Sequence, residues 1–471
     1  MSPGPLAALA GRPDSAPVLA WPGGEIRAGE LLARVEELAA AMRADAHSPG
    51  PIAVVSPRRL DLLLGVLAAL RLGRPALPLD PSRADFEACL EQCAVTVVLR
   101  PSASAPSRIE RLPLPVVPSP VGDPPALLVP TSGTGGATRI AMLPASRLDA
   151  HVAASARHLP PLEQGARWLV CLPVTSIGAL AALWRCLSAG SCFVFLEEFD
   201  AEAARALMAG GVSHVSVVPA MIAALAEATA MPAPRGLRCL LSGGGALSSA
   251  TAGIALARGW PLWNAWGMTE TASHVAAGPV DAGWLEGVGG RPLPGVELGC
   301  EPGGRVSIAG PMLMSGYANP ALMPGIGLEP DGRFLSGDLG ERLEDGSLRL
   351  LGRADDVIVS GGINIHPEIV EEALSHCAGA GEVGVLGRPD PRWGQCIVAV
   401  YTGPANPAAL AACAEALLPA ALRPREFLRV ARLPRNPMGK LLRRQLAAAI
   451  AQDGATGAPD ADVPQDSGPD L

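Results

Sequence analysis

Short apolar runs alternate with helical patterns along most of this 471-residue chain. The order is strand, helix, strand at residues 51–55, 60–72 and 75–79, and again at 213–219, 220–229 and 237–242. Parallel strands need a long crossover between them, which is usually a helix. The alternation therefore predicts an α/β fold with sheets covered by helices.

The pattern changes near residue 339. Two apolar stretches between 339 and 351 are separated by the polar turn Glu344-Asp345-Gly346, which predicts a β-hairpin. A smaller α+β pattern follows and ends near residue 450. The expected organisation is a large domain of helix-covered sheets at 1–353, a small α+β domain at 354–450, and a disordered tail at 451–471, where bulky apolar residues are scarce.

Charge and hydropathy exclude several classes of partner. The net charge is −8 and the pI is near 5.5, which argues against nucleic acid and anionic membranes, since both favour a basic face. The apolar window 168–184 is interrupted by Pro173 and Gly178, so it predicts a buried strand and helix without stable membrane insertion. No secretory signal is visible at Met1–Arg12, and the ten cysteines lack zinc spacing. Buried thiols in a reducing cytoplasm are expected.

A loop rich in glycine and hydroxyl side chains follows the apolar strand expected at 126–129. It comprises Thr131, Ser132, Gly133, Thr134, Gly135, Gly136, Ala137, Thr138 and Arg139. Glycines let backbone N–H groups approach a polyphosphate, hydroxyls donate further hydrogen bonds, and the cation offsets charge. The spacing is not the Walker pattern, and an ordinary Ser/Gly loop is the alternative.

Two later motifs carry groups suited to a nucleotide. In the segment 263–271, Trp266 offers an aromatic face for a purine, and Glu270 beside hydroxyl groups can hold a magnesium ion bound to phosphate. In Ser336-Gly337-Asp338, the carboxylate can accept both ribose hydroxyls. Taken alone, the first motif is equally a strand end capping a helix, and the second is a common turn.

Two glycine-containing motifs lie in the small domain. The segment 359–367 contains Ser360, Gly361 and Gly362 and opens a helix with proline at its start. The segment 433–440 reads Leu-Pro-Arg-Asn-Pro-Met-Gly-Lys and ends at Lys440. Each alone is also compatible with an ordinary turn.

Together and in this order, the motifs resemble those of the adenylate-forming (AMP-binding) superfamily: acyl-CoA synthetases, adenylation domains and luciferases. The resemblance spans about residues 25–446 and includes the segments 242–247 and 289–295, Gly352-Arg353-Ala354-Asp355-Asp356, and SGGxNIxP at 360–367. It implies the adenylate-forming enzyme fold, with a large ATP- and acyl-binding domain and a mobile C-terminal lid that carries the catalytic lysine. The implied reaction joins a carboxylic acid to coenzyme A, with ATP and Mg²⁺, through an acyl-adenylate that releases pyrophosphate and then AMP.

The resemblance also implies roles for individual residues. The catalytic residues would be Lys440, Glu270 and Arg139, with Glu270 and Thr134 at the metal, Asp355 at the hinge, Ser360, Gly361 and Gly362 at CoA, and Ser176 and Gly290 in the acyl pocket. The ATP-binding residues would be Thr131, Ser132, Gly133, Thr134, Gly135, Gly136, Gly244, Gly245, Ala246, Asn264, Ala265, Trp266, Gly267, Met268, Thr269, Asp338 and Arg353. Three positions depart from the family pattern: Arg139 replaces lysine, Thr138 replaces proline, and Trp266 replaces tyrosine.

The basic residues single out one position. Of 37 lysines and arginines, only Lys440 is a lysine. Surface sites tolerate either residue, whereas a narrow site that needs a compact ammonium group does not. That the one lysine occupies the family's catalytic position supports its assignment.

The sequence constrains the identity of the carboxylic acid substrate less than it constrains the reaction class. The segments 168–190 and 268–273 and the short chain resemble the 2-succinylbenzoate–CoA ligases of menaquinone synthesis, which usually carry a histidine where this chain has Ser176. Another aryl or small acyl acid therefore stays open, as do an enzyme that loads a carrier protein in trans and a non-catalytic ATP-binding homologue. A homodimer is one expected assembly, and the cytoplasm is the expected location.

Overall fold

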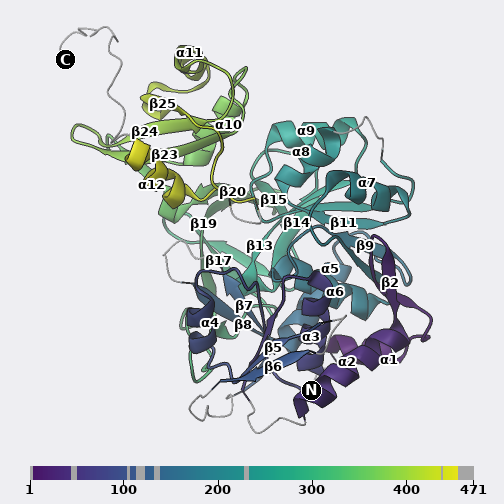
Figure 1. The fold of residues 1–471 in the computed structure, drawn as a ribbon. Helices are drawn as coiled ribbons and strands as arrows, with labels where there is room; N and C mark the ends of the chain where they lie inside the picture. The colour runs from purple at the N-terminus through teal and green to yellow at the C-terminus, as the bar shows by residue number, and fades with distance from the viewer. Residues whose placement is uncertain are drawn as a thin grey trace, which may run out of the picture. The chain divides into compact units, whose positions relative to one another are not determined.

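The computed structural model describes residues 4–43, 50–102, 107–112, 122–131, 138–227, 233–435 and 439–453. Contacts divide the chain into a large unit, made mainly of Met1–Asp355, and a small unit made of Asp356–Asn436 and Lys440–Leu471. The boundary falls after Asp355, where the sequence predicts it after Arg353. Figure 1 shows the helices and strands of both units, coloured from purple at the N-terminus to yellow at the C-terminus.

The larger sheet of the large unit has a parallel centre and antiparallel flanks. The central strands β1, β10, β9, β11, β12 and β13 run parallel. At one side β2 pairs antiparallel with β1. At the other side the antiparallel strands follow β13 in the order β14, β15, β20, β19, β17 and β16. In spatial order the described strands are β16 (Glu297–Cys300), β17 (Arg305–Ala309), β19 (Phe334–Arg342), β20 (Leu348–Arg353), β15 (Val288–Pro292), β14 (Ser273–Pro279), β13 (Leu262–Met268), β12 (Cys239–Ser242), β11 (His214–Val217), β9 (Arg167–Val170), β10 (Cys192–Phe195), β1 (Pro17–Trp21) and β2 (Gly24–Arg27).

A second sheet in the same unit is built around four parallel strands. Its described order is β18 (Gly316–Tyr317), β8 (Arg139–Pro144), β7 (Pro125–Thr131), β4 (Ala76–Leu79), β3 (Ile52–Val55), β5 (Val97–Arg100) and β6 (Arg108–Arg111). The helices of the unit are α1 (Gly4–Ala10), α2 (Ala28–Arg43), α3 (Arg59–Arg71), α4 (Phe86–Gln92), α5 (Ala145–Ala156), α6 (Ile177–Ala189), α7 (Ala201–Ala209), α8 (Pro219–Glu227) and α9 (Ser249–Ala257), with the 3₁₀ turns η1 (Thr269–Thr271) and η2 (Ala354–Asp356). The predicted strand–helix–strand units are confirmed as β3–α3–β4 and β11–α8–β12, and the predicted hairpin is β19–β20.

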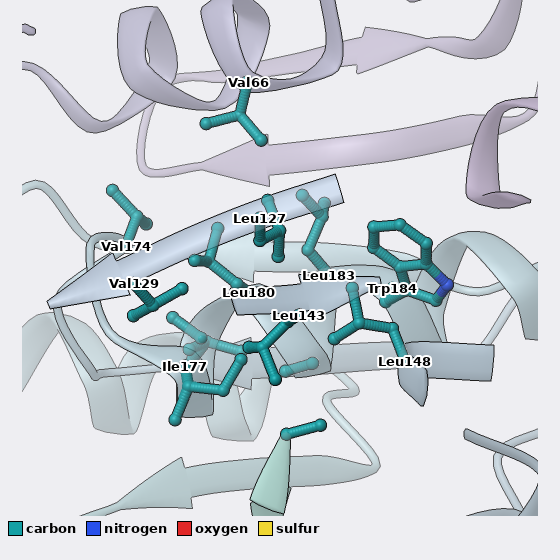
Figure 2. Close-up of a cluster of buried hydrophobic side chains, with 14 of the residues drawn as sticks. Val66, Leu127, Val129, Leu143, Leu148, Val174, Ile177, Leu180, Leu183 and Trp184 are labelled. Atoms are coloured by element: carbon teal, nitrogen blue, oxygen red, sulfur yellow. The ribbon is translucent and has the colours of Figure 1, made fainter. Parts of the chain in front are cut away.

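The pair α5 and α6 lies between the two sheets. Helix α5 contacts β7 and β8, while α6 contacts β9, β10 and β14. Figure 2 shows Leu180, Leu183 and Trp184 of α6 gathered with Leu127 of β7 and Leu143 of β8. All five are buried, and each buried side chain of this size contributes roughly 1.5–3 kcal/mol to stability. This core fixes α6 between the sheets, which matters for the acyl site below.

The small unit is an antiparallel sheet with helices, to which β25 adds in parallel. Its elements are β21 (Ile358–Ser360), β22 (Ile363–Ile365), α10 (Pro367–Ser375), β23 (Val383–Asp390), β24 (Gly394–Tyr401), α11 (Pro407–Leu417), η3 (Ala420–Leu422), β25 (Glu426–Arg429) and α12 (Arg443–Asp453). Helix α12 includes the first three residues, 451–453, of the expected tail, and residues 454–471 lie outside the described part of the chain.

One cysteine expectation is wrong. Cys377, which follows α10, forms a disulfide with Cys413 of α11, although free thiols were expected throughout. The remaining cysteines are free, and all of them except the exposed Cys300 are buried. No described helix combines the length and apolar character needed to cross a bilayer, consistent with the strand and helix observed at 167–189.

Candidate active site

The ends of the predicted phosphate loop come together as paired strands. Thr131 ends β7 and Arg139 begins β8, and the two residues face each other in the ladder. Thr131 is buried and Arg139 is exposed. The Thr138 hydroxyl donates a hydrogen bond to Asp85, whose carboxylate also pairs with Arg83 at 2.8 Å. The loop residues between them, Ser132, Gly133, Thr134, Gly135 and Gly136, lie outside the described residues.

Glu270 forms a buried acidic position beside this loop end. The Tyr317 phenol donates to Glu270 Oε1 at 2.6 Å, and the guanidinium of Arg139 lies 5.2 Å from the centre of the Tyr317 ring. Burial raises the pKa of Glu270, against the hydrogen bond from Tyr317, which lowers it. A bound cation would favour the ionised carboxylate. Tyr317, on β18, was not singled out from the sequence.

The donor set around Glu270 fits Mg²⁺ of the kind that takes most of its ligands from phosphate and water. Across the described ranges, no three His, Cys, Asp or Glu side chains gather closely enough to form a metal site of their own. Glu270 would be the one carboxylate ligand, and Thr134, the other expected ligand, is outside the described residues.

Asp338, on β19, contacts side chains from two other strands of the sheet, β13 and β20. Its Oδ1 accepts from Arg353 Nη1 at 2.7 Å, and its Oδ2 accepts from Trp266 Nε1 at 2.7 Å. The backbone of Asp338 is further fixed by Ser336, whose hydroxyl accepts from the Asp338 N–H at 3.2 Å. Arg353 also pairs with Asp355, the expected hinge residue, at 3.5 Å. The family resemblance assigned both Asp338 and Arg353 to ATP binding. The hairpin β19–β20 brings the two residues opposite each other.

The segments expected around adenine follow neighbouring strands at one sheet edge. Gly244, Gly245 and Ala246 are exposed after β12, and β12 pairs in parallel with β13, which carries residues 264–268. Asn264 is buried and donates its amide to the Val288 carbonyl at 2.8 Å, so this side chain supports the sheet. The other expected residues here, Ala265, Gly267, Met268 and Thr269, are half-buried at the end of β13.

The end of β13 is sterically tight. A Cβ on Gly267 would lie 2.4 Å from His274 Cα, so only glycine fits there. Ala272 and Ser273 have φ values of 54° and 121°, in the region that L-residues rarely adopt. Strain of this kind, of order 1–3 kcal/mol per residue, is typical of functional sites. The backbone that carries Glu270 is therefore held in a specific conformation.

The two residues expected in the acyl pocket both have structural roles. Ser176 caps the N-terminus of α6: its hydroxyl donates to the Pro173 carbonyl at 2.7 Å and accepts from the Ala179 N–H at 3.4 Å. Gly290 has a φ of +89°, and a Cβ there would lie 2.0 Å from the Ala277 carbonyl carbon. Gly290 is therefore required by the close approach of β15 to β14.

A buried polar cluster, missed in the sequence, lies between α5, α6 and β14. Arg185 of α6 donates to Ser155 Oγ at 3.4 Å and lies 4.8 Å from the Trp168 ring centre. Ser155 is 3.4 Å from His274 Nε2, and the His274 ring makes an edge contact with the His151 ring at 4.9 Å. We call these four residues, Ser155, His151, His274 and Arg185, the inner polar cluster.

The inner polar cluster holds one positive charge. Burial, with the neighbouring Arg185, lowers the pKa of His151 to about 3, and burial likewise lowers the pKa of His274. Burial also lowers the pKa of Arg185, to about 10, so the guanidinium stays protonated at pH 7. Within the described part of the chain, Arg185 pairs with no carboxylate, and His151 Nδ1 has no hydrogen-bond partner.

In the small unit, the expected CoA residues form a tight turn. Gly361 and Gly362 connect β21 to β22 with φ values of 58° and 79°, and Ser360 is buried at the end of β21. A Cβ on Gly361 would lie 3.1 Å from the ring of Trp393. The Arg425 guanidinium lies 4.2 Å from the centre of that ring. Trp393 was not predicted, because a tryptophan between Arg392 and Gly394 matches no motif of the sequence.

Lys440 lies in the small unit, next to a β-bridge. The bridge joins Arg435 to Leu441, and the Leu442 N–H donates to the Pro434 carbonyl at 2.9 Å. Three residues on, Arg443 lies within 3.5 Å of Asp356, 3.3 Å of Glu368 and 2.7 Å of Glu371. These contacts tie the start of α12 to α10. The preceding motif residues 436–438 lie outside the described part.

Comparisons with known proteins agree with this arrangement. A family model described as AMP-binding enzyme matches residues 7–318, and a second, AMP-binding enzyme C-terminal domain, matches residues 369–440. A 2-succinylbenzoate–CoA ligase from Bacillus cereus is 31% identical over 339 residues, which are 69% of this chain and 70% of that protein.

Two solved structures share the fold. The o-succinylbenzoate coenzyme A synthetase from Bacillus subtilis, in complex with its acyl-adenylate intermediate, superposes with a TM-score of 0.80 at 27% identity, covering 94% of this chain and 97% of that one. The same enzyme with ATP and magnesium gives a TM-score of 0.82 at 26% identity, covering 94% and 99%. The predicted fold class, a large domain of helix-covered sheets with a smaller α+β domain, is confirmed. The motif-based identification is confirmed as well, and this chain belongs to the AMP-binding enzyme family.

Proposed function

We propose that this protein is an ATP-dependent acid–CoA ligase whose acid is 2-succinylbenzoate. The family, the motif order and the ligase names of its relatives support the reaction class. One observation carries the choice of acid: the buried guanidinium of Arg185 has no carboxylate partner in the described ranges. The cofactor is Mg²⁺, the substrates are the acid, ATP and CoA, and the proposed location is the cytoplasm.

The first half-reaction joins two anions, so the site must neutralise charge and align the reactants. The acid carboxylate attacks the α-phosphorus of ATP, and pyrophosphate leaves. Arg139 at the end of the phosphate loop faces the phosphates, and Asp338 accepts hydrogen bonds from the ribose. Bound Mg²⁺ would screen the phosphate charge, with Glu270 as a protein ligand.

Lys440 completes this half-reaction from the small unit. Its ammonium group contacts the carboxylate oxygen and the α-phosphate as charge develops between them. In the second half-reaction the small domain turns about Asp355, Lys440 withdraws, and the turn Gly361–Gly362 approaches the pantetheine of CoA. The CoA thiol then attacks the acyl carbonyl and AMP leaves. Domain movements of this kind can limit turnover.

The charge of the inner polar cluster supports a dicarboxylic acid. A buried, unpaired cation is costly, and an opposite charge at hydrogen-bond distance offsets that cost. Arg185 lies on α6, whose first turn is capped by Ser176. In the same cluster, His274 of β14 is paired with Gly267 at the end of β13. 2-Succinylbenzoate has two carboxylates, so one can react while the other pairs with Arg185. His151 Nδ1 offers a further polar contact.

A test compares two acids that differ in one carboxylate. Pyrophosphate release is measured with 2-succinylbenzoate and with 3-benzoylpropionate, which lacks the ring carboxylate. We expect Arg185→Met to lower kcat/KM for 2-succinylbenzoate roughly 10²-fold, as when one partner of a buried charge pair is removed, and to change the monocarboxylate little. Arg258→Met is the control, because Arg258 also lies near a tryptophan, 5.9 Å from the Trp260 ring, but on another helix end. Equal losses with both acids would contradict the role of Arg185.

The alternatives have separate outcomes in the same assay. Pyrophosphate release with another aryl or small acyl acid, and none with 2-succinylbenzoate, would favour that acid. Adenylation without thioester formation from free CoA would favour transfer to a carrier protein. A non-catalytic homologue would release no pyrophosphate with any acid. We also propose a homodimer, which sedimentation equilibrium tests directly.

A further inference from the structure

The carboxylate of Asp338 has a donor on each oxygen, and the two donors come from different strands. Trp266 of β13 donates from its indole Nε1 to Oδ2, and Arg353 of β20 donates from Nη1 to Oδ1, both at 2.7 Å. A carboxylate with donors on both oxygens cannot rotate without breaking one bond. Each oxygen can still accept a second hydrogen bond, because it has two lone pairs.

The Trp266 side chain that donates this hydrogen bond is buried by its neighbours. Trp266 shares a face of β13 with the buried residues Leu262 and Asn264, and only 7% of its surface is exposed. A Cβ on Gly289 would lie 2.9 Å from Trp266 Cβ, so β15, which pairs with the far side of β14, also packs closely against the tryptophan. The enclosure holds the indole N–H toward Asp338, a role beyond the stacking that the sequence suggested.

We propose that Trp266 is a positioning residue for the ATP ribose: its indole N–H orients the Asp338 carboxylate. This inference rests on the proposed function, since it takes ATP as the ligand. Arg353 alone would leave Asp338 free to turn about the single remaining hydrogen bond. With both donors in place, the two free lone pairs point in fixed directions, and the ribose 2′- and 3′-hydroxyls can bind without the cost of ordering the side chain.

The indole N–H can be tested separately from the ring. Trp266→Phe keeps an aromatic ring and removes the donor. Adenylation is measured with ATP and with 2′,3′-dideoxy-ATP, which lacks the hydroxyls that Asp338 would bind. We expect Trp266→Phe to lower kcat/KM for ATP about tenfold, in line with loss of a hydrogen bond to a charged group, and to change kcat/KM for dideoxy-ATP less than twofold. The preference for ATP over the dideoxy nucleotide then shrinks by the same factor.

Trp263→Phe is the matched control. Trp263 lies on the same strand with its side chain on the opposite face, where its ring makes an edge contact with His158. This variant should keep the parent's preference for ATP. If Trp266→Phe weakens both nucleotides equally, the proposal is overturned, because both carry the base and only ATP carries the ribose hydroxyls that Asp338 would bind.

A second substitution covers the case in which Trp266→Phe does not fold. Replacing Trp266 with 3-benzothienylalanine keeps the bicyclic ring and its volume but has sulfur in place of the N–H. The same selective loss for ATP is expected, and an unchanged ratio between the nucleotides in a folded variant would overturn the proposal. Failure of the proposed function looks different: the parent protein itself would then show no acid-dependent pyrophosphate release with ATP.

Discussion

Reduction of the Cys377–Cys413 disulfide should destabilise the small unit by up to about 4 kcal/mol. The two cysteines are 36 residues apart in sequence, and their Cα atoms lie 6.0 Å apart. Closing a loop of that length removes about 13 cal/mol/K of entropy from the unfolded chain, which is about 4 kcal/mol at 25 °C. The disulfide joins Cys377, which is buried after α10, to α11.

Hydrogen exchange measures the stability of the small unit separately from that of the large unit, because the two units need not unfold together. Peptides from α10 and α11 are followed by mass spectrometry with and without reductant. Since about 1.4 kcal/mol corresponds to a factor of ten, amides that exchange by unfolding of the small unit should exchange up to about 10³-fold faster after reduction. Intact mass reports the disulfide itself, because oxidation of two thiols removes two hydrogens.

The control is Cys396→Ala, which removes a buried free thiol from the same unit. That variant should keep the difference between oxidised and reduced protein, whereas Cys377→Ala combined with Cys413→Ala should abolish it. A reduced protein with the same protection in α10 and α11 as the oxidised one would refute the reasoning. So would an unreduced protein whose mass shows every cysteine as a thiol.

Three further predictions concern single side chains. Tyr317→Phe removes the hydrogen bond that lowers the pKa of Glu270, so the loss of adenylation on acidification should begin at a higher pH and the KM for Mg²⁺ should rise several-fold; an unchanged pH–rate profile would argue against this contact. Burial raises the pKa of Glu371 to about 7 in the folded protein, so the small unit should lose stability as pH rises from about 4.5 to 7, and Glu371→Gln should flatten that dependence in thermal melts at several pH values. Trp393→Ala should raise the KM for CoA several-fold through the Gly361 turn and leave acid-dependent pyrophosphate release intact, whereas equal loss in both half-reactions would point to a folding defect.

Local patterns were sufficient for much of the fold. The βαβ units follow from the change between strand and helix periodicity, and the β19–β20 hairpin follows from its Glu-Asp-Gly turn. The hairpin then places Asp338 opposite Arg353, two residues that the motifs had already assigned to one nucleotide. Signals of this kind depend on neighbours in sequence, which is why they could be read without a structure.

Contacts between distant segments could not be read in the same way. The disulfide joins positions 36 residues apart with no local pattern. Arg185 did leave a signal, since it is the single charged residue of α6, but its partners on α5 and β9 come from other parts of the chain. Trp266 was interpreted by its aromatic character, although the alternation of β13 already placed it on the buried face with Leu262 and Asn264.

Acid-dependent exchange of labelled pyrophosphate into ATP, measured for the parent and for Lys440→Ala, tests whether Lys440 catalyses formation of the acyl-adenylate. We expect exchange that requires 2-succinylbenzoate and Mg²⁺, needs no CoA, and falls on the order of 10²-fold or more in the variant, as expected for loss of a preorganised charge contact. Exchange as fast in Lys440→Ala as in the parent would contradict the account, as would its absence from the parent with every carboxylic acid offered.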